Sequence, residues 1–327
     1  MLLRTPHLKA YTTIPGAVAR RMSYSPPQLD AQIERASQPD FQSLEIVYQS
    51  SPSWPYNPNS QTPVHISILD SSFNPPTRAH HAISAASFPS LNANSSRMLT
   101  EGPGEYTARL LLFSARNVDK KLKEHEPSIK ERVEMMILQA KAMEEEQRCG
   151  SGGIAVGLIN EPTFAGKSVI TKSHFARQST KSHTPHNPPT KITLTFLIGT
   201  DTLIRFFDPR YYKIDMQETL RKYFSDREED HGDGSYLVSA RRGVDETDRG
   251  IENEVLKREE VKGWVEMGKV RLLGSGNEGW EEISSTRIRD NVKALNADST
   301  EGDMAKALKN LCIPDISKYI HRKGLYK

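Results

Sequence analysis

The sequence has few cysteines, no long apolar segment and almost no net charge. Cys149 and Cys312 are the two cysteines in 327 residues, and they lack a metal-ligand spacing. We therefore expect a protein of a reducing cellular compartment, without a disulfide framework. No apolar run approaches the ~20 residues that span a bilayer, so we expect no membrane segment. The formal net charge is +3, from 44 basic and 41 acidic residues. Charge therefore gives no reason to expect a nucleic-acid partner.

The first part of the chain differs in composition from the rest. Residues 1–29 carry four basic side chains, several Ser and Thr, and no acidic residue before Asp30. This composition fits a mitochondrial transit peptide, and it equally fits a disordered basic tail. Residues 48–63 are rich in Pro, Ser and Asn and indicate a linker. We therefore expect residues 1–63 to be a disordered tail and a linker. We expect an intracellular protein of the cytoplasm or nucleus, with mitochondria as the alternative location.

From residue 64 onward, strand-like and helix-like segments alternate. This alternation predicts an α/β fold, a Rossmann-like doubly wound parallel sheet with flanking helices and a helical C-terminal segment. The domain is expected to span residues 64–327, with insertions near 90–106, 172–190 and 225–234. The expected strands are 64–69, 109–113, 154–159, 192–198, 236–239 and 270–273, and the clearest expected helices are 129–147, 251–267, 284–295, 303–311 and 315–321.

The most informative segment is a strand, a tight turn and a helix start at residues 64–80. Backbone N–H groups at a helix start are unpaired and the helix dipole favours anions, so this arrangement predicts a phosphate site. Pro75-Pro76 prevents the helix from starting earlier, and Thr77 and His80 fall in its first turn. His80 would add a donor near the phosphate. An ordinary surface histidine is the alternative for His80.

A second polar cluster, I-S-S-T-R-I-R, occupies residues 283–289. Ser284 is a good N-cap, so the N–H groups that follow form a second anion site. Arg289 lies four residues after Ser285 on the same helix face, and hydroxyls, amides and a guanidinium together suit a polyphosphate. An ordinary capped helix with surface arginines is the alternative interpretation.

Polar residues also follow other expected strands. Gly199 permits close approach of a ligand, and Asp201 could accept hydrogen bonds from a nucleoside or serve as a helix N-cap. Lys120 and Arg241 add cations at two further strand ends. Because the carboxyl ends of parallel strands meet at one sheet edge, these clusters predict a site for phosphoryl or nucleotidyl chemistry.

Both ordered clusters resemble motifs of the nicotinamide mononucleotide adenylyltransferase family, within the H-x-G-H nucleotidyltransferase superfamily. S-S-F-N-P-P-T-R-A-H is similar to the family's G-S-F-N-P-[IP]-[HT]-x-x-H, and I-S-S-T-R-I-R resembles its I-S-S-T-x-I-R. Weaker likenesses are I-G-T-D, V-D-K-K, S-A-R-R-G and the C-terminal I-P-D-I-S-K-Y-I-H-R-K-G-L-Y. The resemblance covers residues 64–327 apart from the insertions, and the insertions with the Pro-rich N-terminus resemble the fungal branch.

The resemblance implies adenylyl transfer from ATP, with Mg²⁺, to nicotinamide mononucleotide, which gives NAD and pyrophosphate. It implies catalytic roles for His80, Lys120 and Arg289, in which His80 contacts the ATP phosphates directly. The implied ATP-binding residues are Ser72, Phe73, Thr77, Gly199, Asp201, Ser284, Ser285 and Thr286. The implied mononucleotide-binding residues are Asn74, Glu161, Phe164 and Arg241. Protein-bound metal is not implied, and a homo-oligomer is left open.

Two departures from the family pattern favour a second hypothesis. Ser71 stands where the family usually has Gly, and a Cβ there could narrow the phosphate turn. Glu161 matches, but the Trp that usually precedes it to stack the pyridine is absent, and Phe164 is the only aromatic residue close by. The alternative function is therefore a nucleotide-binding regulator or weak ATPase that has lost transferase activity.

Overall fold

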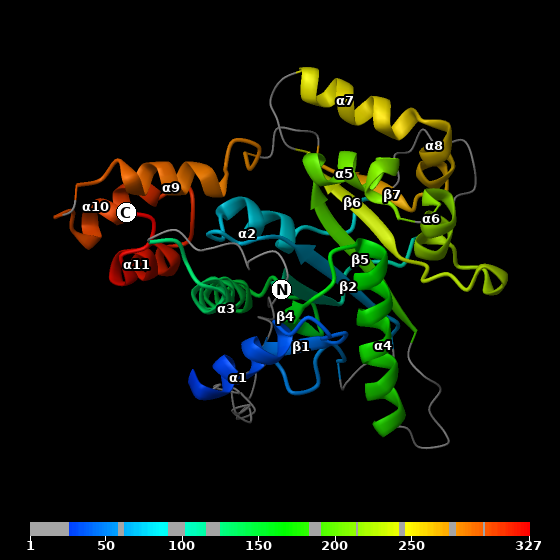
Figure 1. Cartoon of the computed structure of the whole chain (residues 1–327), viewed down its shortest axis with the longest axis horizontal. Coiled ribbons are helices and arrows are strands. Elements are labelled where there is room, and N and C mark those ends of the chain that lie inside the picture. Colours follow the sequence, from blue (N-terminus) through cyan, green and yellow to red (C-terminus); the bar gives the residue numbers. More distant parts are fainter. Residues whose placement is uncertain are drawn as a thin grey trace, which may run out of the picture.

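The computed structural model describes residues 26–57, 62–90, 102–115, 125–182, 191–213, 215–241, 246–274, 279–296 and 298–327. Within them, one sheet of seven strands forms the centre of the molecule (Figure 1). The strands are β1 (Leu44–Gln49), β2 (Val64–Asp70), β3 (Ala108–Ser114), β4 (Gly153–Ile159), β5 (Ile192–Gly199), β6 (Tyr236–Ala240) and β7 (Val270–Leu273).

The order of the strands is that of a doubly wound sheet. Neighbouring strands run β1-β4-β3-β2-β5-β6-β7, and every pairing is parallel except that of β1 with β4. The chain steps outward from β2 through β3 to β4, then returns to the other side of β2 and steps outward through β5, β6 and β7. The predicted fold class is confirmed. In such sheets ligands bind where this order reverses, outside the carboxyl ends of the strands, which here is the edge beside β2 and β5.

Helices cover both faces of the sheet, as the burial of β2, β3 and β5 on both sides requires. The helices are α1 (Pro26–Ala36), α2 (Arg78–Ala85), α3 (Ile129–Glu145), α4 (Phe164–Ser182), α5 (Thr200–Phe206), α6 (Met216–Phe224), α7 (Glu246–Lys257), α8 (Glu259–Glu266), α9 (Ser285–Lys293), α10 (Glu301–Leu308) and α11 (Pro314–Lys323). Short 3₁₀ turns lie at Pro209–Tyr211 and Glu228–Asp230.

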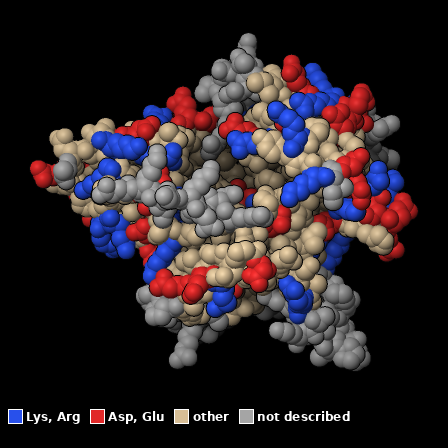
Figure 2. Space-filling view, in the orientation of Figure 1, with Lys and Arg blue, Asp and Glu red and all other residues tan. Residues whose placement is uncertain are grey.

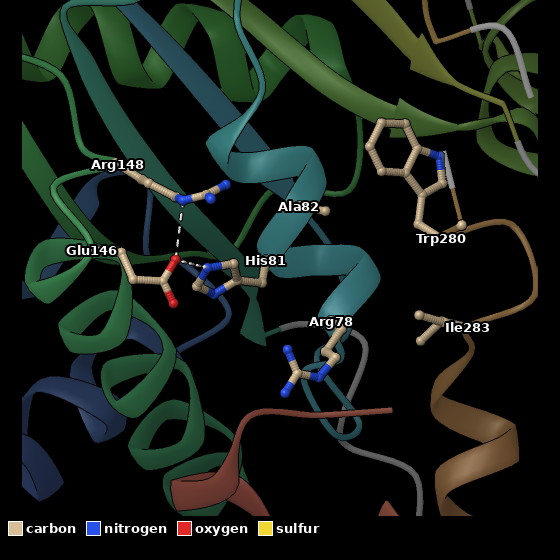
Figure 3. Close-up of a pocket in the computed structure, with 8 residues that line it drawn as sticks. Arg78, His81, Ala82, Glu146, Arg148, Trp280 and Ile283 are labelled. Carbon is tan, nitrogen blue, oxygen red and sulfur yellow. Dashed lines mark hydrogen bonds and ion pairs between the residues drawn. The ribbon is translucent and has the colours of Figure 1, made fainter. Parts of the chain in front are cut away.

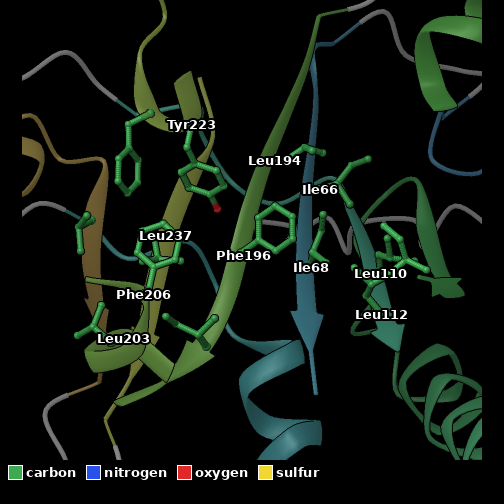
Figure 4. Close-up of a cluster of buried hydrophobic side chains, with 14 of the residues drawn as sticks. Ile66, Ile68, Leu110, Leu112, Leu194, Phe196, Leu203, Phe206, Tyr223 and Leu237 are labelled. Carbon is green, nitrogen blue, oxygen red and sulfur yellow. The ribbon is translucent and has the colours of Figure 1, made fainter. Parts of the chain in front are cut away.

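Alternate residues of the strands supply two hydrophobic cores. Ile66 and Ile68 of β2 face a core with Phe196 and with side chains of α4 to α8 (Figure 4). Leu69 and Leu111 face the other core, which α1, α2 and α3 close. A third, smaller core joins α9, α10 and α11 to the outer side of α3, so the C-terminal helices lie together at one side of the sheet (Figure 1).

The prediction that the folded part begins at residue 64 is wrong. Gln32 of α1 donates hydrogen bonds to Glu45 and to the carbonyl of Ile46, and β1 forms the antiparallel edge of the sheet. The expected linker is anchored as well, because Trp54 is buried against Phe175, with ring centroids 5.6 Å apart. One short strand and one buried aromatic residue are enough to fix a segment whose composition resembles a loop.

Two of the expected insertions are built into the fold. The first eleven residues of the expected insertion at 172–190 continue α4, and Phe175 there is fully buried. In the expected insertion at 225–234, Asp226 forms an ion pair with Lys269 at 2.7 Å, next to β7. Of the insertion at 90–106, residues 91–101 lie outside the described part. The expected helix 251–267 is two helices, α7 and α8, separated at Arg258.

Candidate nucleotide site

The turn after β2 has an unusual backbone at Phe73. Its φ is 43°, in the left-handed region that side chains other than Gly seldom adopt. The Phe73 ring is fully buried in the core next to α2, and its centroid lies 5.1 Å from that of His80. Burial of an aromatic ring offsets the backbone cost. Only the Phe73 backbone can therefore take the predicted part in a nucleotide site.

A capping box fixes the start of α2. The Thr77 hydroxyl accepts a hydrogen bond of 3.2 Å from the His80 N–H, and the Thr77 N–H donates one of 3.0 Å to Nδ1 of His80. Because a backbone N–H can only donate, Nδ1 carries no proton and the neutral ring has its proton on Nε2. Nε2 lies 2.9 Å from the Ser71 hydroxyl. His80 is buried, with 6% of its surface exposed.

The expectation of free amides at the start of α2 needs correction. The N–H groups of Thr77 and His80 are used within the capping box, and the Arg78 N–H donates to the carbonyl of Leu311 at 2.8 Å. A helix start that satisfies itself in this way has few amides left for an anion. The hydroxyl groups of Ser71 and Ser72 are further donors at this turn, and Ser72 is exposed.

The second cluster lies directly against this turn. Ser284 caps α9 by accepting from the Arg287 N–H, as predicted. The Ser285 hydroxyl donates to the carbonyl of Pro75 at 2.8 Å, and Nη1 of Arg289 donates to the carbonyl of Asn74 at 2.7 Å. The prediction that the two clusters come together is confirmed.

Two further side chains complete this junction. Nη2 of Arg289 donates to the Thr286 hydroxyl at 3.0 Å, and the Tyr326 hydroxyl donates to Oδ1 of Asn74 at 2.8 Å. Asn74 therefore holds the turn in place from both its backbone and its side chain, so its predicted contact with a mononucleotide would have to use its remaining amide N–H groups. Ser285 and Thr286 follow the cap, where backbone N–H groups have no partner within the helix. The start of α9 thus provides what an anion needs, including a guanidinium.

The third cluster is only partly assembled. Gly199 is the N-cap of α5 with an extended φ of −91°, and Asp201 is exposed in the first turn, so Asp201 is not the cap. Arg241 forms a 2.9 Å ion pair with Glu252 of α7, which is almost fully buried. Burial raises the pKa of Glu252, and the Arg241 guanidinium opposes this rise. Lys120 lies outside the described residues.

The residues predicted for the pyridine nucleotide have partners in the protein. The Glu161 carboxylate accepts from the Thr163 N–H at 2.8 Å and from its hydroxyl at 2.6 Å, just before α4. The Phe164 ring packs edge-on against Phe196 and Phe206, and Nζ of Lys167 lies 5.0 Å from its centroid. Stacking on Phe164 would therefore need the ammonium group to move away or the opposite ring face to be open.

Sequence reasoning missed Lys167. This lysine forms an ion pair with Asp70 at the end of β2, and both side chains are largely buried. The pair neutralises a carboxylate directly beside the turn, where it would repel a phosphate. No local signal pointed to Lys167, because it lies in a stretch of α4 that has no apolar periodicity.

A cavity of about 660 Å³ lies beside α2, which contributes Arg78, His81 and Ala82 to its lining (Figure 3). Helical periodicity places Arg78, His81 and Ala82 on one face of α2, and His80 points back towards the turn. The Glu146 carboxylate lies 3.0 Å from Nε2 of His81 and pairs with Arg148 at 3.1 Å, so it offsets the charge of Arg148. Trp280 and Ile283, just before α9, line the opposite side.

The visible surface near the turn is hollowed between the C-terminal helices and α5 (Figure 2). Basic and acidic side chains alternate over this face, without a large patch of one sign. Among the described residues, no group of three His, Cys, Asp or Glu could hold a metal ion. Among the same residues, no helix is long and apolar enough to cross a membrane.

Comparison with known proteins gives only a distant likeness. No protein-family model matches the sequence, and no curated protein matches it. Among solved structures, the nicotinic acid mononucleotide adenylyltransferase of Plasmodium falciparum in complex with NaAD is 18% identical, with a TM-score of 0.45 over 80% of this chain and 97% of that chain. The same enzyme in complex with APC is 16% identical, with a TM-score of 0.46 and the same coverage. This likeness is too distant to transfer residues or activity.

Proposed function

We propose that this protein transfers the adenylyl group of ATP to nicotinamide mononucleotide, forming NAD and pyrophosphate. The observation that carries the proposal is the contact of two polyphosphate-type clusters, through Ser285 to Pro75 and through Arg289 to Asn74. Both clusters resemble, in order, the two signatures of one adenylyltransferase family. Their contact at the carboxyl edge of β2 is where a doubly wound sheet binds nucleotides.

The reaction needs little covalent chemistry from the protein. A 5′-phosphate oxygen of the mononucleotide attacks the α-phosphorus of ATP, and the bond from that phosphorus to the bridging oxygen of the β-phosphate breaks. Catalysis then depends on alignment of the two nucleotides and on stabilisation of the negative charge. In this proposal Arg289 and the backbone amides of Ser285 and Thr286 hold the β- and γ-phosphates, so that the leaving pyrophosphate is already paired with donors.

Magnesium enters the proposal as part of the substrate. We expect Mg²⁺ to arrive on the ATP phosphates, where it would neutralise charge. Lys120 is proposed to meet the mononucleotide phosphate, and Gly199 and Asp201 the adenosine.

A specific observation favours the second candidate, a nucleotide-binding regulator without transferase activity. The acceptor side is less complete than the ATP side, because Arg241 is paired with Glu252 and Phe164 packs against the core. Such a protein would bind ATP and form no dinucleotide.

A coupled assay separates the two candidates. The protein is incubated with ATP, Mg²⁺ and either nicotinamide mononucleotide or its acid analogue, and dinucleotide and pyrophosphate are measured. We expect product with nicotinamide mononucleotide well above that of His80→Ala. If product forms only with the acid analogue, the acceptor is that analogue and not nicotinamide mononucleotide. Binding of ATP by calorimetry without product from either acceptor would support the regulator.

A further inference from the structure

Ser71 lies between the buried His80 ring and the open side of the turn. Its hydroxyl is 2.9 Å from Nε2 of His80, and the other ring nitrogen is occupied by Thr77. Ser71 is partly exposed, whereas His80 is buried. Both ring nitrogens of His80 therefore have hydrogen-bond partners in the protein. Of the two partners, Ser71 is the one nearer the solvent.

The protons of this chain of hydrogen bonds have a defined direction. The Thr77 N–H requires Nδ1 to accept, so the neutral His80 ring donates its Nε2 proton to the Ser71 oxygen. The backbone N–H of Ser71 donates to the carbonyl of Leu112 at 3.3 Å. The hydroxyl proton of Ser71 has no acceptor among the residues that the structure describes. Ser71 thus retains one unused donor at the phosphate turn.

We propose that Ser71 contacts a phosphate of ATP and that His80 is a positioning residue that acts through it. The inference rests on the proposed function and replaces a direct His80–phosphate contact. The Ser71 hydroxyl donates to a phosphate oxygen, while the Nε2 proton of His80 holds the serine oxygen and polarises it. No covalent bond changes in this arrangement.

Two neighbouring features support this assignment. The amides of Thr77, Arg78 and His80 are already paired, so the Ser71 hydroxyl supplies a donor that these three amides do not. Asp70, the residue before Ser71, is neutralised by Lys167. A phosphate can therefore approach the Ser71 hydroxyl without meeting an uncompensated carboxylate.

A double-mutant cycle tests the proposal. Ser71→Ala removes the hydroxyl, and His80→Asn removes the Nε2 donor while its amide oxygen still caps Thr77. We expect each variant to raise the KM for ATP about 10-fold, the size of one hydrogen bond to a charged group. The double variant should be no weaker than either single variant, because His80 acts only through Ser71. Ser71→Thr keeps a hydroxyl and should restore the KM to within about 3-fold.

The controls distinguish this inference from the proposed function. Ser87→Ala, an exposed serine just after α2, should behave as wild type. If the increases in the KM for ATP multiply in the double variant, or if the KM of Ser71→Ala is unchanged, the inference is wrong. The proposed function would still stand in that case, because the protein would still form dinucleotide. If the wild type binds ATP but makes no dinucleotide, the proposed function fails and the same cycle is measured on ATP affinity by calorimetry. Absence of ATP binding would overturn both.

Discussion

Arg289 donates a 2.7 Å hydrogen bond to the backbone carbonyl of Asn74, a residue 215 positions earlier in the chain. The contact fixes the guanidinium beside the turn that follows β2. Ser285 supports it from the same helix through Pro75. Two segments that are each unremarkable alone, a turn after a strand and a capped helix, therefore form one structural unit whose donors point to the same edge of the sheet.

Arg289→Ala should lower the rate of dinucleotide formation about 10- to 100-fold, since hydrogen bonds to charged groups contribute about 1.5–3 kcal/mol. The loss combines a missing phosphate contact with a turn whose Asn74 carbonyl no longer has the Arg289 donor. Steady-state kinetics with ATP as the varied substrate measure it, and circular dichroism checks the fold.

Arg287→Ala is the matched control, because Arg287 lies on the same helix and is exposed. We expect a change of less than about 2-fold, as for most surface substitutions. Equal losses in the two variants would show that net charge near α9, and not the position of Arg289, determines the rate.

The fold could be predicted because its strands carry continuous apolar runs that end in polar residues. The seven-stranded sheet confirms six of them, and β1 was missed because it lies next to a Pro-rich segment whose composition resembles a linker. Helix α4 was missed for another reason. Its buried Lys167 and Ser168 pair with Asp70 and with Ser235, so polar residues occupy positions where an apolar stripe would be expected.

The site was predictable where each cluster is local in sequence. Ser284 caps its helix as its sequence position indicates. The capping box at Thr77 and His80 was not expected, because Thr-x-x-His lacks the Glu or Gln that usually marks this motif. Asp70 lies 97 positions before Lys167, and Glu252 lies 11 positions after Arg241 on another element, so the local pattern around each cation did not indicate that it is paired.

Arg109→Met should lower the free energy of unfolding by about 3 kcal/mol, because it removes donors from buried carbonyl groups. The Arg109 guanidinium bonds the carbonyls of Ser84 at 2.6 Å and Ala86 at 3.1 Å, at the end of α2. It therefore holds the helix that carries His80 onto β3. Urea denaturation measures the change, with Arg221→Met, an exposed arginine of α6, as a control that should lie within about 0.5 kcal/mol of wild type. A stability loss as small as that of the control would contradict this role.

The free energy of unfolding should decrease in mild acid because of His65. Burial lowers the pKa of His65 from 6.5 to about 4, while its ring nitrogens contact the Gly104 carbonyl and the Thr195 hydroxyl. Below pH 6.5 the unfolded chain takes up a proton that the folded chain does not. Stability should therefore fall between pH 6.5 and about 4, by about 3 kcal/mol at most.

The test compares urea denaturation at several pH values for wild type and His65→Asn. The variant lacks the titrating ring, so the difference in stability between the two proteins should shrink as the pH falls. A constant difference across the range would show that His65 does not couple folding to protonation.

Both cysteines should resist alkylation in the native protein. Burial raises the pKa values of the Cys149 and Cys312 thiols to about 12, so almost no thiolate exists at pH 8. Iodoacetamide labelling followed by mass spectrometry should find neither residue modified in the folded state and both modified in urea. Rapid labelling of either cysteine in the native protein would contradict the burial of its thiol.

The most direct measurement is dinucleotide formation from ATP, Mg²⁺ and nicotinamide mononucleotide, with pyrophosphate counted in parallel. Wild type and Arg287→Ala should each produce one pyrophosphate for every dinucleotide, at similar rates. Arg289→Ala should produce both products more slowly. ATP binding by the wild type without any dinucleotide, from this acceptor or its acid analogue, would contradict adenylyl transfer.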